Sequence, residues 1–221
     1  MSPWGLAGSG DARPRPSPGV VPRTPRAGTL PGRFRRPVTA DRCLQPSRLA
    51  RPSRYARVMD TYERILKLRA IRDYEDRMLS DEDLNKILEA ARWTGSSKNL
   101  QNWSFVVVSD PAQKNRLAAA GNFTVPITNA PVAVAIVEEP GGYEFDSGRV
   151  AQNIMLAADA IGVASCPITL HRGELAGEVL GLPEGRRCRY AISLGYPAPG
   201  AGPARFGGRK PMGDLVHYDR Y

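Results

Sequence analysis

The segment over residues 95–103 carries more polar groups than a simple connection needs. It reads GSSKNLQNW and runs directly into the apolar SFVVV. A hydroxyl, an ammonium and two amides are contributed by Ser96, Lys98, Asn99 and Gln101, between a periodic helix and an apolar strand. Such groups can hold a ligand that combines a polyol chain with a heteroaromatic ring. A solvated capping loop is the alternative, because Ser and Asn are common loop residues.

Two pairs of basic residues lie outside this segment. The stretch LRAIRDY places Arg69 and Arg72 three positions apart, so a helix would present both guanidinium groups on one face, within reach of one anion. The stretch FGGRKP places Arg209 and Lys210 directly after two glycines, which allow close approach of the backbone to a ligand. Together with the polar segment, the two pairs predict one specific ligand that carries a phosphate.

The location of the net charge argues against a nucleic-acid binder. The chain has 221 residues and a net charge of +9. Residues 1–57 contain twelve Arg, no Lys and two Asp, which gives +10, whereas residues 58–221 contain 19 basic and 20 acidic residues, which gives −1. The near-neutral part offers no broad basic face to a phosphate backbone. We therefore expect no nucleic-acid partner.

Residues 1–57 also hold ten of the twenty prolines and show no apolar period, so we expect a disordered extension. Three explanations for it remain open. A transit peptide is rich in Arg, but ten prolines oppose its amphipathic helix. A nucleic-acid arm would need interleaved aromatic residues. The third explanation is that residues 1–57 are upstream GC-rich DNA read through as protein. In that case the true start is Met59, and the extension is not part of the native protein. The folded domain is then residues 58–221.

The periodicity of this domain predicts helices and strands in alternation. Helices are expected over 60–69, 80–91, 110–121, 146–161 and 174–180, and strands over 105–108, 132–137, 163–166 and 190–194. Either Asp146 or Ser147 is expected to cap the fourth helix, whose apolar surface is so wide that little of it can face water. Because the order lacks a strict βαβ rhythm, we expect an α+β domain with a mixed sheet.

Several common classes of site are not supported by the sequence. Residues 58–221 contain neither a Gly-rich dinucleotide loop nor a P-loop. Neither His171 nor His217 has acidic or cysteine neighbours at ligand spacing, so we expect no metal site. No run of 18 apolar residues predicts a membrane span, and we expect no membrane partner. The three cysteines fit no disulfide framework, which favours the cytoplasm and predicts that Cys166 and Cys188 are buried.

Longer motifs resemble the flavin-dependent nitroreductase family. They are MDTYERILKLRAIRDY, ILEAARWTGSSKNLQNWSFVVV, FDSGRVAQNIMLAADAIGVASCPI, LGLPEGRR, ISLGYPAPG and GGRKPMGDLVHYDRY. The resemblance extends over residues 59–221 in the family's order. It implies an α+β sandwich with a mixed, mainly antiparallel sheet flanked by helices. It also implies an intertwined homodimer, with FMN in each of two interface clefts and a C-terminal segment that reaches over the partner.

The resemblance further implies which residues bind FMN. Phosphate and pyrimidine contacts correspond to Arg69 and Arg72, and ribityl and ring-edge contacts to Ser96, Asn99 and Gln101. The segment beneath the isoalloxazine corresponds to Pro167, Ile168, Thr169 and Leu170, with the backbone N–H of Leu170 addressing flavin N5. The C-terminal phosphate clamp corresponds to Arg209 and Lys210, and Asn122 is aligned by its distance from the strand at 132.

The activity implied is that of an FMN oxidoreductase that takes hydride from NADH or NADPH by a ping-pong mechanism. The N–H of Leu170 would stabilise charge at N5, and Arg72 would offset negative charge on the reduced pyrimidine. The small-molecule acceptors implied are nitroaromatics, quinones or activated alkenes. The chain departs from the family's pattern at Leu68 and Ala70, where an arginine and a serine are usual. This departure motivates an alternative, a protein that stores or sequesters FMN with little turnover.

Overall fold

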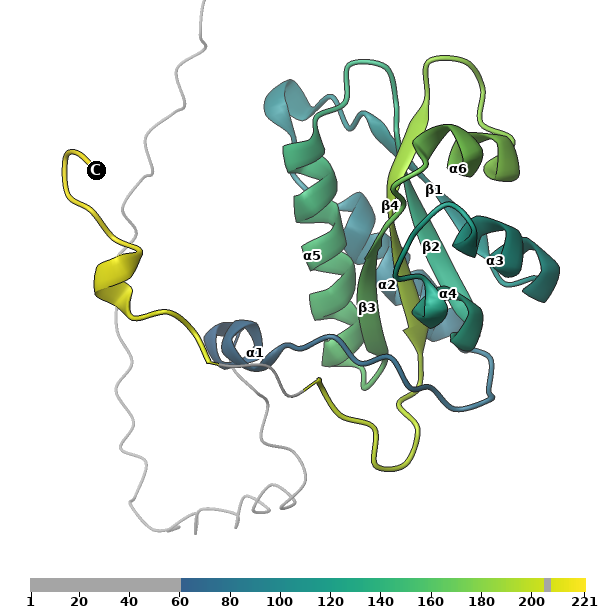
Figure 1. The fold of residues 1–221 in the computed structure, drawn as a ribbon, viewed down its shortest axis with the longest axis horizontal. Helices are drawn as coiled ribbons and strands as arrows, with labels where there is room; N and C mark the ends of the chain where they lie inside the picture. Colours follow the sequence, from purple (N-terminus) through teal and green to yellow (C-terminus); the bar gives the residue numbers. More distant parts are fainter. Residues whose placement is uncertain (1–60, 205–207) are drawn as a thin grey trace, which may run out of the picture. The chain divides into compact units, whose positions relative to one another are not determined.

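The computed structural model describes residues 61–204 and 208–221. The predictions about residues 1–57 and about the start of a helix at Asp60 lie outside these ranges. The described part is an α+β domain in which helices cover both faces of one sheet, as the sequence predicts (Figure 1). No helix within these ranges is long and apolar enough to cross a membrane.

The helices and strands follow one another in nearly the predicted order. They are α1 (Thr61–Lys67), α2 (Asp81–Arg92), the 3-10 turn η1 (Ser97–Asn99), β1 (Trp103–Val108), α3 (Pro111–Ala118), α4 (Val125–Asn129), β2 (Val132–Glu138), α5 (Glu144–Ala160), β3 (Ala164–Thr169), α6 (Gly173–Leu180), β4 (Arg187–Gly195) and the 3-10 turn η2 (Met212–Asp214). The sequence did not predict α4, because five residues are too few to show a helical period.

The sheet has the strand order β1-β2-β4-β3, and its three pairings are all antiparallel. The expected mixed sheet is therefore wholly antiparallel in the described part of the chain. The central pair is long-range, since Val134 of β2 lies opposite Ile192 of β4. Central β2 is buried along its whole length, which explains why its sequence is continuously apolar rather than alternating.

Each face of the sheet has its own apolar core. On one face, Val134, Ile154 and Ile192 belong to a cluster that β2 and β4 build with α2 and α5. On the other face, Leu117 and Ala135 belong to a cluster that includes α3, α4 and α6. Figure 1 shows the same division, with α2 and α5 on one side of the sheet and α3, α4 and α6 on the other.

The edge strand β1 corrects one expectation. The sequence predicts a fully buried strand over 105–108, but β1 is half-buried, and the side chain of Val107 is exposed. The reason is its position, because an edge strand has a neighbour on one side only. Both cysteines in the described part are buried free thiols, as predicted.

Helices α2 and α3 are capped by Ser80 and Asp110, the residues at which the sequence predicts these helices to begin. The side chains of Ser80 and Asp110 accept hydrogen bonds from the backbone N–H groups of Asp83 and Gln113, 3.1 Å and 2.8 Å away. The prediction for α5 is wrong, because the helix begins at Glu144 after Tyr143. Ser147 is the fourth residue of α5 and therefore does not cap it.

This Ser147 hydroxyl belongs to a buried polar cluster at the end of β2. It donates to one carboxylate oxygen of Glu138 over 3.0 Å, and Arg187 of β4 donates to the other over 2.6 Å. Glu138 is only 2% exposed, so these two bonds satisfy a carboxylate that water does not reach. The cluster ties the start of α5 to the two central strands.

We expect Glu138→Ala to lower the free energy of unfolding by about 2–3 kcal/mol, because the buried Ser147 hydroxyl loses its acceptor and a buried space opens, whereas the largely exposed Arg187 is solvated by water. Chemical denaturation of wild type and variant measures the loss. The matched control is Glu139→Ala, whose carboxylate also accepts from an arginine and a serine but is more exposed. Its expected loss is about 1 kcal/mol or less. Equal losses would contradict a special role for the buried carboxylate.

Candidate functional site

The first arginine pair does not lie on a helix face, which corrects the sequence-based prediction. Helix α1 ends at Lys67, and the chain then runs along the outer edge of β3, where the N–H of Ile71 donates to the Ser165 carbonyl over 3.0 Å. Arg69 closes the helix, because its Nη1 donates to the carbonyl oxygens of Leu66 and Leu68, at 2.8 Å and 2.7 Å. Helical periodicity therefore stops before the pair begins.

The second member of the pair, Arg72, lies beside β3. Burial raises the pKa of the Cys166 thiol, and the positive charge of the nearby Arg72 guanidinium offsets part of that rise. The neighbouring Tyr74 hydroxyl is 2.7 Å from the Ser193 hydroxyl, and burial raises the pKa of this phenol. Arg72 thus lies near the sheet, whereas the Arg69 side chain is held at the end of α1.

Arg69 and Arg209 line one cavity of about 540 Å³, which we call the Arg69 cavity. Its other lining residues are Ile65, Leu66, Leu68, Ala70, Gln152 and Met155. The two residues are 140 positions apart in the sequence, yet they line the same cavity. The sequence predicted that both bind one ligand, and the structure brings them together. Lys210 does not line this cavity. The departures Leu68 and Ala70 do, and they give it apolar walls.

A second cavity of about 360 Å³, the Pro167 cavity, lies between α5 and the end of β3. It is lined by Glu144, Gly148, Ala151, Pro167, Ile168, Thr169, Tyr190 and Ile192. Helix α5 contributes lining residues to both cavities. Among them are Glu144, Gly148, Ala151 and Met155, which follow one another at spacings of four, three and four. Residues at these spacings share one helix face. The Arg69 and Pro167 cavities therefore follow one another along the same side of α5.

The backbone of β3 offers a hydrogen-bond donor at this position, but not at the predicted residue. The N–H of Leu170 donates to the Arg189 carbonyl over 2.8 Å, and the Leu170 side chain is fully buried. Along an antiparallel strand, bonded residues alternate with residues whose N–H and C=O point away from the partner. Ser165 points away and accepts from Ile71, so Thr169, four positions later, also points toward the outer edge. The available N–H is that of Thr169.

The polar segment forms a strained loop around η1. Lys98, Asn99 and Gln101 have φ angles of 51°, 54° and 53°, a region that non-glycine residues rarely adopt. The loop is held closed by the Ser96 hydroxyl, which accepts from the N–H of Gln101 over 2.9 Å. Backbone strain of this kind persists only where surrounding contacts enforce it, and it is concentrated at functional sites.

Two residues of α5 hold the base of this loop. Arg149 donates to the Gly95 carbonyl over 2.5 Å, and Asn153 donates to the Thr94 hydroxyl over 2.8 Å. No residue of 96–101 is among those that line the Arg69 cavity or the Pro167 cavity. Within one chain, the structure therefore brings the arginines together but not the arginines and the polar loop.

The last predicted residue, Asn122, lies in a third place. Its N–H faces His171 Nδ1 at 3.3 Å, and its side-chain oxygen accepts from Arg172 over 3.0 Å. Arg172 also donates to the carbonyl oxygens of Ala119 and Gly121. Asn122 thus belongs to a structural junction between α3 and the end of β3.

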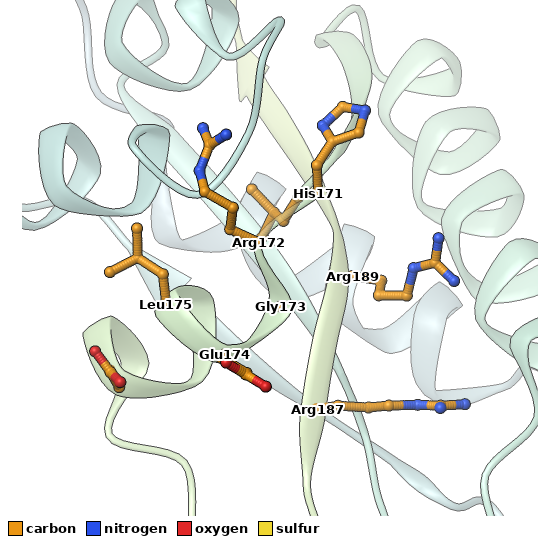
Figure 2. Close-up of a pocket in the computed structure, with 9 residues that line it drawn as sticks. His171, Arg172, Gly173, Glu174, Leu175, Arg187 and Arg189 are labelled. Carbon is orange, nitrogen blue, oxygen red and sulfur yellow. The ribbon is translucent and has the colours of Figure 1, made fainter.

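His171 and Arg172 also line the cavity of about 680 Å³ shown in Figure 2. The other basic side chains there are already paired, because Arg187 binds Glu138 and Arg189 binds Glu144. In Figure 2 the side chains of Arg187 and Arg189 both point away from Arg172. This cavity therefore has no converging cations that would bind a phosphate.

Two lining residues of the Pro167 cavity, Glu144 and Tyr190, were missed by sequence reasoning. Tyr190 was read only as a strand residue. A usable signal did exist for the helix: Gly148 and Ala151 are small residues three apart on a helix of large apolar ones, a spacing that leaves room for a ligand. Nothing in the spacing of Glu144 and Tyr190 links them, because they are 46 positions apart.

Comparison with known proteins places this geometry in a family. The family model "Nitroreductase family" matches residues 65–139 and 126–196. A relative from Archaeoglobus fulgidus, assigned as an NADH dehydrogenase/NAD(P)H nitroreductase, is 35% identical over 140 residues, which cover 58% of this chain and 80% of the relative. The NADPH-flavin oxidoreductase of Vibrio harveyi is 32% identical over 184 residues, covering 73% of this chain and 75% of the relative.

A solved structure shares the fold. It is the NADPH:FMN oxidoreductase from Vibrio harveyi complexed with NAD+, with a TM-score of 0.64 and 27% identity, covering 72% of this chain and 77% of that chain. The match of the family model extends over more than half of the chain, from the last turn of α1 to just past the end of β4. The chain belongs to the nitroreductase family.

Proposed function

We propose that the protein is an FMN-dependent oxidoreductase that takes hydride from NADH or NADPH and passes it to a small acceptor by a ping-pong mechanism. The observation that carries the proposal is the alignment of the two cavities on one side of α5. One has two guanidinium groups at its wall, and the other has an outward backbone N–H and an apolar floor. FMN has a phosphate at one end and a flat ring system at the other, so its polarity fits this order.

The residues of the chain would divide the binding of FMN between them. Arg69 and Arg209 suit the phosphate, because guanidinium groups match phosphate oxygens in geometry and charge. The N–H of Thr169 suits an acceptor nitrogen on the ring, in place of the Leu170 N–H. Pro167 and Ile192 offer apolar surface to the ring. Arg72, whose charge lies near Cys166, suits the pyrimidine side.

When bound, FMN supplies the hydride chemistry itself. The protein then needs no side chain that exchanges protons, which agrees with a pair of cavities lined mainly by apolar and hydrogen-bonding groups. Its residues orient the ring, hold the phosphate and leave one side open to a nicotinamide and then to an acceptor. The acceptors proposed are nitroaromatics, quinones and activated alkenes.

A second copy of this chain would complete the site. The polar loop is held by Arg149 and Asn153 and does not line either cavity, yet its hydroxyl and amides suit a ribityl chain. Helix α1 has no buried residue, and the side chains of Ile65 and Leu66 are about half exposed. A homodimer in which the loop of one chain meets the cavities of the other would cover this apolar surface and assemble all predicted contacts.

Storage of FMN without turnover is the less favoured function, since the relatives are named as oxidoreductases. The two functions are separated by colour. We expect the purified protein to be yellow and to bleach on anaerobic addition of NADH or NADPH, because reduction removes the visible absorbance of the flavin. Yellow protein that keeps its colour with both nicotinamides would support storage, and protein that binds no FMN would contradict both functions.

We propose that the protein acts in the cytoplasm. We also propose that the extension over residues 1–57 contributes nothing to the functional domain. Every residue matched to the flavin site lies between Arg69 and Lys210. Deletion of 1–57 is expected to leave flavin content, dimerisation and turnover within about twofold of the full chain. Absorbance, sedimentation and steady-state assays measure the three properties. Loss of flavin in the shortened protein would show that the extension contributes to the site.

A further inference from the structure

One charged residue distinguishes the Pro167 cavity. Of its eight lining residues, Glu144 is the only one with a charged side chain, and the rest are apolar or carry single hydroxyl groups. Glu144 is the first residue of α5 and 46% of its side chain is exposed, so its carboxylate lies at the rim rather than in the core.

Two neighbours from β4 hold this carboxylate in place. Arg189 Nη1 and the Tyr190 hydroxyl both donate to Glu144 Oε1, over 2.7 Å and 2.8 Å. Since both bonds end on the same oxygen, Oε2 keeps its lone pairs. The hydrogen bond to Glu144 raises the pKa of Tyr190, so the phenol stays protonated and continues to donate to Glu144. Toward the cavity, both groups therefore present hydrogen-bond acceptors.

The position of Tyr190 connects this pair to the reacting end of the site. Tyr190 lies directly opposite Thr169 in the β3–β4 pairing, and both residues line the Pro167 cavity. Directly opposite residues place their side chains on the same face, about 5 Å apart. In the proposed site the flavin ring is the group that reaches the Thr169 N–H. The ring would therefore share the cavity with Tyr190, and the Glu144 carboxylate at the rim would face a molecule that approaches the ring.

We propose that Glu144, fixed by Tyr190 and Arg189, selects the charge of the molecule that accepts hydride. Neutral ligands with N–H or O–H donors are favoured, and ligands with a carboxylate or sulfonate beside the reducible group are disfavoured. This inference rests on the proposed oxidoreductase function. The physical cause is repulsion between like charges at short range, together with the lack of a donor for an incoming anion. Arg189 does not line the cavity, so a ligand there meets the Glu144 carboxylate and not the Arg189 guanidinium.

The test compares two acceptors of the same shape. 4-Nitrobenzoate and 4-nitrobenzamide differ in charge but hardly in size. Wild type is expected to prefer the amide in kcat/KM, and Glu144→Gln is expected to shift the ratio toward the acid by about fivefold. Dissociation constants of the unreactive pair benzoate and benzamide, from changes in the flavin absorbance, should shift in the same direction. Glu178→Gln, which removes the same charge from α6, is the control and should leave both ratios unchanged.

A second variant predicts a change of opposite sign. Tyr190→Phe keeps the aromatic ring but removes one donor from Glu144, so the carboxylate faces the ligand with less neutralisation. Its preference for the amide is expected to increase about twofold. Unchanged ratios in both variants of an enzyme that still bleaches with NADH or NADPH would overturn the charge selection and leave the oxidoreductase function intact. Wild-type protein that neither binds FMN nor bleaches would overturn both.

Discussion

Replacing both Arg69 and Arg209 with alanine is expected to weaken FMN binding by about a thousandfold. Charge-assisted hydrogen bonds contribute about 1.5–3 kcal/mol each, and two such losses correspond to a factor of roughly 10²–10⁴ in Kd. The two guanidinium groups line the same cavity although they come from opposite ends of the domain. Titration of FMN into the apo-protein, followed by flavin fluorescence, measures the change.

Two controls separate this effect from a loss of folding. Lys210→Ala removes a neighbouring positive charge that does not line the Arg69 cavity, and it is expected to change Kd by no more than about threefold. Arg69 also closes α1 through two carbonyl oxygens, so the melting temperature of each variant must be followed. A double variant that melts like wild type and still retains FMN would contradict the phosphate role.

Mixing two inactive variants is expected to restore activity, which is the second large effect. One variant carries Arg69→Ala with Arg209→Ala, and the other carries Ser96→Ala with Asn99→Ala. If each site takes its arginines from one chain and its polar loop from the other, a mixed dimer contains one site without substitutions and one with all four. Random exchange makes half of the dimers mixed, so about a quarter of all sites should regain FMN and turnover.

The same experiment tests whether one chain suffices. Refolding the two variants together allows exchange, and refolding them apart before mixing is the control. Activity near zero in both preparations would mean that the loop and the arginines of a site come from the same chain, or that the loop does not contribute. The strained φ angles of Lys98, Asn99 and Gln101 favour a contribution, since the chain maintains that conformation at a cost in stability.

Local signals in the sequence predicted much of the fold. Ser80 and Asp110 cap helices that begin at the next residue, and each accepts from an N–H three positions later. Both partners of each cap therefore lie in the same short stretch of sequence, which is enough to predict where the helix begins. The continuous apolar run of β2 likewise predicts burial on both faces. The early end of α1, the short α4 and the exposed side of β1 depend on what packs against them. The packing partners of α1 and β1 are distant in the sequence, and α4 is also too short to show a helical period, which is why these three features were not predicted.

The site shows the same division. Residue types and a family resemblance predicted that Arg69 and Arg209 bind the ligand, and the structure places both at one cavity. The resemblance pointed to the N–H of Leu170, but the alternation of β3 against β4 assigns that group to the sheet and leaves Thr169 facing outward. Strand register decides which backbone groups are available, and a single sequence does not reveal register. Contacts such as Glu144 with Tyr190 need the folded chain for the same reason.

The pairing of β2 with β4 has a consequence for synthesis of the protein. Val132 lies opposite Leu194, so the central strand of the sheet must wait for a segment made about sixty residues later, although its other partner, β1, is already present. On the ribosome, the most apolar strand of the chain would remain half-paired while α5, β3 and α6 emerge. Long-range antiparallel pairing closes slowly and exposes apolar edges to aggregation. High expression is therefore expected to favour binding of β2 by chaperones until β4 leaves the exit tunnel.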